Sequence, residues 1–313
     1  AAVAHNRLGV TGDGPDADGD GITIAASVNG RDGSSGVTSL TSKSLSATAK
    51  QSASLTAKVY ATAAAIGWVD ANKVGVSASG AGADATNTVK QSLSAEVIGR
   101  GDGATLTTTG DGGGSAALIN LSADDTSELS TTATGAALAF SFSLGTSIAP
   151  AVGVSLADNT LIRNQLAQLQ GFSVGGGTGG VITSGDIQVQ STSSGTMEAT
   201  SVAVAIAASL AESSLGLAGG GAQSFNTVLG ASQALIGDSD IGETSAPISG
   251  TLTVTATDST TIDSEVDAIA ASLTFSDGES STAAAIGVAL SRNFIGETQG
   301  NSGVSGGDPK PYD

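Results

Sequence analysis

The sequence predicts an all-β protein, and within that class a parallel β-solenoid (β-helix) made of about four degenerate repeats of 65–80 residues. Three observations predict it. The segment at 283–296, AAAIGVALSRNFIG, returns in degraded form along the chain. A short strand of alternating polarity precedes several of these returns. The composition is rich in Ser, Thr, Val and Ala, with 45 Gly and 3% aromatic residues, and this favours thin, closely stacked walls of strand.

The first marker of the repeat is an asparagine. Each return has a run of small residues, then a polar corner with the asparagine, then one or two apolar residues. We expect the asparagine to cap its own turn and to bond its counterpart one coil away, which would build a structural ladder. The alternative is an asparagine that only tolerates a left-handed corner and forms no ladder. The residues are Asn6, Asn87, Asn159, Asn226 and Asn293, which lie 81, 72, 67 and 67 residues apart.

The second marker is the alternating strand itself. INLSA begins at Ile119, IQVQS at Ile187 and LTVTA at Leu252, so the separations are 68 and 65 residues. Two markers that move in step indicate true repeats, and such repeats must stack because one alone cannot bury its faces. The simplest arrangement is one wide coil per repeat, with three strands and three corners. Two narrower coils per repeat is the alternative.

The repeats can be taken in order as one continuous solenoid. We expect a strand at 22–28, and for the polar, Ala-rich stretch at 37–71 the Ser and Thr density favours strand over the competing helix. In the third repeat the stretch at 201–210 alternates with period 2, and its second face is small rather than charged, as in a tightly stacked wall. The predicted boundaries are 1–39 (end of a preceding repeat), 40–114 (repeat 1, irregular), 115–185 (repeat 2), 186–250 (repeat 3) and 251–313 (repeat 4).

Charge and composition exclude several classes of function. The net charge of −18 makes nucleic acid a poor partner, because few cations could neutralise phosphates. There is no cysteine for a disulfide, a metal or a thiol nucleophile. We find no stretch that reads as a membrane span or signal peptide. Residues 40–114 are near neutral and 115–313 strongly acidic, so the two ends of the array differ in charge.

One loop has the start of a calcium-binding pattern. Asp16, Asp18 and Asp20 alternate in DADGDG, where carboxylates on a turn can converge on a hard cation and a glycine permits the bend. Ser27 stands where an EF-hand has its bidentate glutamate, so Asp13, Asp32 or a neighbouring chain would have to complete the shell. Ca²⁺ is the only cofactor we expect, and a solvated acidic loop is the alternative.

Other candidate sites have weaker patterns. Residues 100–102 spell RGD in a glycine-flanked loop, a short motif in a glycine-rich chain. The acidic trio Asp124, Asp125 and Glu128 is interpreted as a solvated face. His5 is the only histidine, so Ser-His-Asp chemistry is not expected, and we predict no catalytic residues. The aromatic residues Tyr60, Trp68 and Phe140 are interpreted as wall packing rather than a sugar platform.

The repeat pattern resembles a known group. An alternating xVxVxA strand, a polar Ser/Thr segment and then AAAIGVALSRN or VGVSLADNT resemble the repeats of giant bacterial extracellular β-strand-repeat proteins, the leukotoxin-like filamentous adhesins. The resemblance implies secretion, display at the bacterial cell surface and a structural or adhesive role. It supplies no catalytic residues.

These observations together predict a structural subunit or segment of an extracellular filament or filamentous adhesin. The chain begins inside one asparagine unit and finishes just after another, so we expect β-edge stacking, head to tail, with copies of itself or adjoining repeats. Surface glycans are further expected partners. A carbohydrate- or host-binding surface module is the alternative, and a polysaccharide-active β-helix enzyme ranks below it.

Overall fold

The computed structural model describes residues 1–11, 18–30, 37–70, 73–110, 117–172, 180–183, 185–242, 248 and 250–296. These residues form strands and turns and contain no helix, so the all-β prediction is confirmed, including strand over helix at 37–71. The strands are β1 (Ala2–Leu8), β2 (Ile22–Asn29), β3 (Ser39–Ser42), β4 (Leu45–Gln51), β5 (Ser54–Val69), β6 (Val74–Val76), β7 (Ser79–Ile98), β8 (Thr105–Thr108), β9 (Ile119–Asp125), β10 (Glu128–Ser143), β11 (Thr146–Gln170), β12 (Gly180–Thr183), β13 (Ile187–Ser193), β14 (Thr196–Gly237), β15 (Leu252–Asp258) and β16 (Thr261–Gly296).

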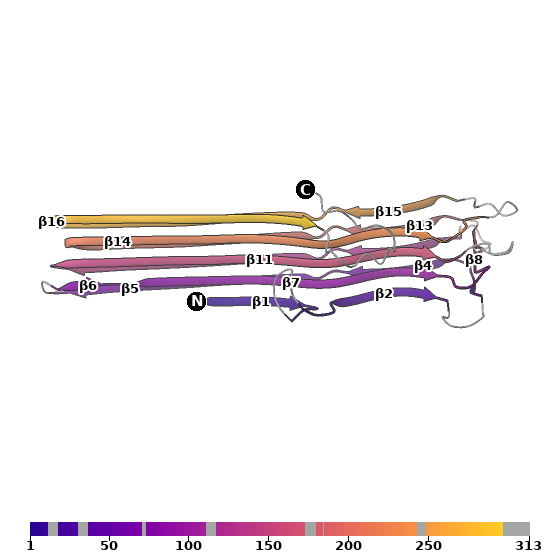
Figure 1. Ribbon diagram of the computed structural model, residues 1–313, viewed down its shortest axis with the longest axis horizontal. Coiled ribbons are helices and arrows are strands. Elements are labelled where there is room, and N and C mark those ends of the chain that lie inside the picture. The colour runs from indigo at the N-terminus through magenta and orange to yellow at the C-terminus, as the bar shows by residue number, and fades with distance from the viewer. Residues whose placement is uncertain are drawn as a thin grey trace.

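Every pairing between these strands is parallel. The largest sheet has nine strands with the order β1-β7-β11-β14-β10-β5, and β16, β2 and β6 pair alongside that path. Two smaller sheets have the orders β15-β13-β9-β4 and β12-β8-β3. A long strand therefore lies beside the equivalent strand of the next repeat, and the sheets grow by one layer per repeat (Figure 1).

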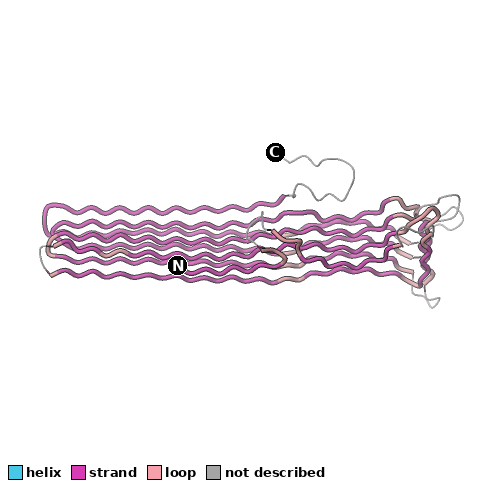
Figure 2. Tube along the Cα trace, turned by 60° about the horizontal axis from the view of Figure 1, so that its bottom comes forward, coloured by secondary structure: helices cyan, strands magenta, loops and turns pink. Residues whose placement is uncertain are grey.

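The nine-stranded sheet folds over and nearly closes on itself, because β14 and β16 run through both of its sides. The first wall consists of β5, β10, residues 196–211 of β14 and residues 261–276 of β16. The second wall consists of β1, β2, β6, β7, β11, residues 213–237 of β14 and residues 280–296 of β16. The two walls form a long flat blade. At one end the two smaller sheets supply the two other sides around the second wall, so that end is three-sided (Figure 2).

The register between layers matches the repeats found in the sequence. Ile187 pairs with Ile119 on one side and with Leu252 on the other, so the second marker stacks in a column. The second repeat contributes four strands rather than the predicted three, since a short β12 follows the long β11. In the third repeat one continuous strand, β14, replaces the separate strands and the expected corner between them.

Small residues let the two walls of the blade approach closely. Its core is a cluster of alanines, among them Ala137, Ala151 and Ala205. A Cβ on Gly135 would overlap the main-chain oxygen of Val154 on the other wall. Serine hydroxyls also reach across to backbone carbonyls. The bonds are Ser201 to Ser155 at 2.9 Å, Ser209 to Ser147 at 3.0 Å and Ser224 to Ala199 at 2.7 Å.

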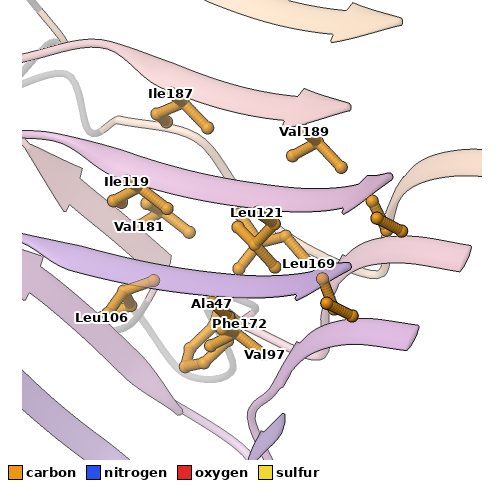
Figure 3. Packing of buried hydrophobic residues seen from close by; sticks show 14 of the residues in the cluster. Ala47, Val97, Leu106, Ile119, Leu121, Leu169, Phe172, Val181, Ile187 and Val189 are labelled. Atoms are coloured by element: carbon orange, nitrogen blue, oxygen red, sulfur yellow. The ribbon is translucent and has the colours of Figure 1, made fainter. Parts of the chain in front are cut away.

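The three-sided end holds the larger apolar side chains. Leu121, Leu169 and Phe172 are buried there with Ile119 and Ile187, and the side chains come from all three sheets (Figure 3). A third, smaller cluster of Val89, Leu129, Leu161, Met197 and Val228 lies apart from this core and from the alanine core of the blade. The sequence thus grades from Ala to Leu, Ile and Phe as the walls separate.

Candidate functional site: the asparagine ladder and the buried arginine

The five marker asparagines form one continuous hydrogen-bonded column. Each donates from its Nδ2 to the Oδ1 of its counterpart in the next layer. The distances are 2.9 Å from Asn6 to Asn87, 3.0 Å from Asn87 to Asn159, 2.9 Å from Asn159 to Asn226 and 3.1 Å from Asn226 to Asn293. The column therefore has a direction: it ends in an acceptor oxygen at Asn6 and in a donor amide at Asn293.

The ladder also ties the two walls together. Each of the first four asparagines uses its amide to donate to a main-chain carbonyl of the first wall as well, and the acceptors occupy one register column of that wall. The bonds are Asn6 to Thr56 at 2.8 Å, Asn87 to Ser130 at 2.9 Å, Asn159 to Glu198 at 2.7 Å and Asn226 to Asp263 at 2.6 Å. Because the three inner asparagines are fully buried, these bonds satisfy amides that water cannot reach.

The predicted corner position of the asparagines is wrong. Asn87 and Asn159 lie in the middle of β7 and β11, and Asn226 lies well inside β14. Among the described residues Asp238 is the only non-glycine with positive φ, so the left-handed alternative does not apply to these positions. The flanking Gly, Ala and Ser residues, which suggested a turn, instead let extended strands from two walls come close enough for an amide to bridge them.

A buried arginine was missed by the sequence analysis. Arg163 of β11 is almost fully buried and lies 3.4 Å from Asp125 (Nη1 to Oδ2) and 2.6 Å from Asp258 (Nη2 to Oδ2). It also donates to the hydroxyl of Thr260 at 2.7 Å. Asp125 and Asp258 flank Ser193 in the same register column, so the guanidinium spans two layers past a small side chain.

Neighbouring residues make room for this ion pair. Gly230 is the register partner of Arg163 in the next layer, has φ +128°, and a Cβ there would overlap the main-chain oxygen of Arg163. Burial raises the pKa of Asp258, but hydrogen bonds from Thr260 and the charge of Arg163 outweigh it and hold that pKa below its ordinary value.

The interpretation of the acidic trio as a solvated face is wrong for one member. Asp125 is fully buried, and its Oδ1 accepts from the main-chain N–H of Ser127 at 3.0 Å and from its hydroxyl at 2.6 Å. Asp124 points the other way and lies 3.4 Å from Lys50. The alternation of a strand places neighbouring carboxylates on opposite faces, so only one of them reaches Arg163.

A second polar group lies on the outward face of the second wall. His5 Nε2 lies 3.2 Å from Asp84 Oδ2, and Thr86 donates to Asp84 Oδ1 at 3.2 Å. Asp158 is close to this group. Burial, followed by the negative charge of Asp84, raises the pKa of Asp158 to about 6, against hydrogen bonds from Gln223 and Phe225 and the charge of His5 that lower it.

The structure describes only part of the predicted calcium loop. Asp13 and Asp16 lie outside the described residues. Asp18 and Asp20 are exposed, and the carbonyl of Asp18 accepts from the main-chain N–H of Thr11 at 2.8 Å. The described part of the chain contains no group of three or more His, Asp or Glu side chains that could hold a metal ion.

The aromatic residues and the RGD turn both lie at the surface. Tyr60 and Trp68 are 65% and 78% exposed on the outward face of β5, so their interpretation as wall packing is wrong. Their odd-numbered neighbours face the alanine core, where such large rings could not fit. Residues 100–102 are exposed in a turn, with the backbone of Arg100 bonded to Thr38 on both its N–H and its carbonyl side.

Comparisons with known proteins add no identification. A scan against family models, a search of curated proteins and a search of solved structures each found no match. Within the residues that the structure describes there is no helix able to cross a membrane.

Proposed function

We propose that the chain is a segment of a parallel β-solenoid and serves as a structural subunit of an extracellular bacterial filament or filamentous adhesin. The observation that carries the proposal is the open edge at each end of the stack. Leu252 and Val254 of the last layer are each 44% exposed, while the residues below them in the same columns, Ile187 and Val189, are fully buried. Within the residues that the structure describes, the apolar columns of the core thus continue to the edge of the last layer, where no large side chain covers them.

The asparagine ladder supports the same proposal. Its acceptor end at Asn6 and its donor end at Asn293 are complementary, so the donor end of one stack suits the acceptor end of another. If the register of the second wall continues unchanged, residues 280–296 of β16 in one copy lie beside β1 of the next, with Ala289 opposite Ala2 and Asn293 opposite Asn6. The first wall has one layer fewer than the second, so the strands of the second wall make this joint.

The mechanism of the filament is repeated main-chain pairing. Each layer advances the axis by about 4.8 Å, and each added layer extends the amide ladder and the apolar columns. The partners are copies of the chain or adjoining repeats, arranged head to tail. Calcium at the loop of Asp18 and Asp20 would screen acidic charge near the joint, and this part of the proposal is separable from the stacking itself.

One pair of variants tests the stacking. Val254→Lys places a charge in an inward-facing column at the open edge, while Thr255→Lys places the same charge on the outward face of the same strand. Electron microscopy should show fibres for the unmodified chain and for Thr255→Lys, and single particles for Val254→Lys. Single particles from the unmodified chain, or equal fibres from both variants, would contradict the proposal. A chelator added to the unmodified fibres tests the calcium component.

A carbohydrate- or host-binding module is the second candidate. The exposed rings of Tyr60 and Trp68 favour it, because exposed aromatic faces are common sugar platforms. Most outward positions around them are aliphatic, however, and offer few hydroxyl or amide groups to a sugar. Pull-down on insoluble polysaccharides tests it, with Trp68→Ala as the control.

A further inference from the structure

The outward face of the first wall is an apolar surface on which none of the described strands packs. Four strands contribute five outward positions each, in register across the wall. We call these positions the first-wall grid. Its rows are Tyr60, Thr134, Val202 and Asp267; Thr62, Ala136, Val204 and Ile269; Ala64, Leu138, Ile206 and Ala271; Ile66, Phe140, Ala208 and Leu273; and Trp68, Phe142, Leu210 and Phe275. Asp267, at one corner, is the only charged member.

The large side chains on the two edge strands of the grid, β5 and β16, are its most exposed members. Ile66 is 76% and Trp68 78% exposed, and Phe275 at the opposite edge is 59% exposed. Trp68 and Phe142 lie with their ring centroids 6.2 Å apart, so they form the start of a ridge that continues through Leu210 to Phe275. Contiguous apolar surface of this kind marks an interaction site rather than a random surface.

The grid is large enough for a specific contact. Five alternate positions on a strand cover about 30 Å and four strands about 19 Å, so the face measures roughly 550 Å². Two such faces would bury roughly 1,100 Å² in total, above the approximate minimum of about 1,000 Å² for a specific protein interface. Flat faces of sheets pack about 10 Å apart, as in β-sandwiches.

We propose that the first-wall grid packs face to face against the same grid of a second copy of this chain. The reason is its periodicity: the grid repeats at the layer spacing of the parallel stack, and a second copy offers a flat face with the same spacing. A two-fold contact of this kind uses one surface patch twice and closes on itself. It joins stacks side by side, so it does not depend on the end-to-end joint proposed above.

Charge and chemistry disfavour other occupants of the grid. Thr62 and Thr134 are its only hydroxyl-bearing aliphatic positions, which is too few polar groups to orient a sugar chain. The net charge of −18 opposes approach to an anionic lipid surface. The same charge repels a second copy, so the contact should strengthen as salt screens the acidic positions outside the grid.

The test places charges on each wall in turn. Ile66→Lys with Leu138→Lys puts two charges into the grid, and Val152→Lys with Val154→Lys puts two charges on the outward face of the second wall at positions that are also partly exposed. Mass is read by sedimentation equilibrium for particles and by mass per unit length in scanning transmission electron microscopy for fibres, at about 0.15 M and about 1 M NaCl so that the effect of screening is seen. Either readout decides the side-by-side contact whether or not end-to-end stacking occurs.

We expect the unmodified chain and the second-wall variant to show twice the mass, or twice the mass per length, of the grid variant. Equal values for all three would overturn the proposal. Binding of the unmodified chain to insoluble polysaccharide or to neutral phosphatidylcholine vesicles, with no doubling, would overturn it in favour of those occupants. Because the chain has no cysteine, Ala136→Cys gives a second measurement without added charge: a short bis-maleimide should cross-link it into dimers, and should leave Val152→Cys uncross-linked.

Discussion

Arg163 and Asp258 form a 2.6 Å ion pair although 95 residues separate them along the chain. The pair joins β11 to the last residue of β15, one full layer further than β14, which pairs directly with β11. Together with Asp125 it places one buried cation between two carboxylates, whereas the asparagine and serine bonds between the walls are neutral. At this point the layers of the stack are therefore cross-linked by ion pairs.

Removal of Arg163 should be strongly destabilising. Arg163→Gln puts the residue found at the equivalent position of the preceding layer, Gln91, in its place, and leaves Asp125 buried without its cation. We expect a loss of about 3–5 kcal/mol in the free energy of unfolding, measured by urea denaturation. Adding Asp125→Asn should recover part of the loss because it removes the unpaired charge. No recovery would mean that packing, not charge, is what Arg163 supplies.

An interior rung of the ladder should matter more than an end rung. Asn159→Ala removes both ladder bonds of this rung and the bond to the Glu198 carbonyl, and it leaves the buried Oδ1 of Asn226 without its ladder donor, so it should cost about 3 kcal/mol. Asn6→Ala removes one interlayer bond at the edge and should cost about 1 kcal/mol. Thermal or urea unfolding measures both. Equal costs would show that the column does not act as a ladder.

The pKa of Asp158 predicts how stability depends on pH. Because the pKa of Asp158 is about 6 in the folded state and an aspartate ordinarily has a pKa of 3.8, the folded state binds the proton more tightly than the unfolded state. This contribution is fully present below about pH 4 and is lost as pH rises through 6. It amounts to about 2 kcal/mol after allowance for partial exposure. Asp158→Asn should stabilise the fold at pH 7 and remove this dependence. An unchanged pH profile in that variant would contradict the assignment.

The closeness of the blade walls can be tested by overpacking. Ala205→Leu adds three heavy atoms between walls where even a Cβ on Gly135 or Gly153 would meet backbone, so we expect at least 3 kcal/mol of destabilisation or failure to fold. Val204→Leu adds bulk at the adjacent outward position and should change stability by less than about 0.5 kcal/mol. Circular dichroism melts distinguish them. Similar melting of the two variants would mean that the walls are further apart than described.

Some structural features could be predicted from the sequence and others could not, depending on which interaction fixes each residue in place. The asparagine period was detectable because parallel stacking places identical residues in register, and a ladder needs the same amide in every layer. The location of the asparagines within strands could not be predicted, because Gly, Ala and Ser are common beside turns and also where two strands approach closely. The exposure of Trp68 was missed because aromatic residues are usually buried, and the small size of its inward neighbours was not weighed.

The burial of Arg163 could have been predicted from the alternation of inward and outward side chains along β11. It shares the odd-numbered face of β11 with Asn159 and Leu161, and both of those were readable as inward-facing. A charged residue on an inward face requires an opposite charge inside, so a search for an inward carboxylate in the short strands would have led to Asp125. The second carboxylate, Asp258, follows only from the three-dimensional register of β13 with β15.

The central claim is that the open edges of this stack join end to end. Cryo-electron microscopy of the unmodified chain tests it most directly, through the layer-line spacing and the register at the joint. The account predicts long straight fibres with a meridional repeat of about 4.8 Å and, at each joint, Asn293 of one copy bonded to Asn6 of the next. Discrete particles one chain long at high concentration would contradict it, as would fibres joined through any other surface.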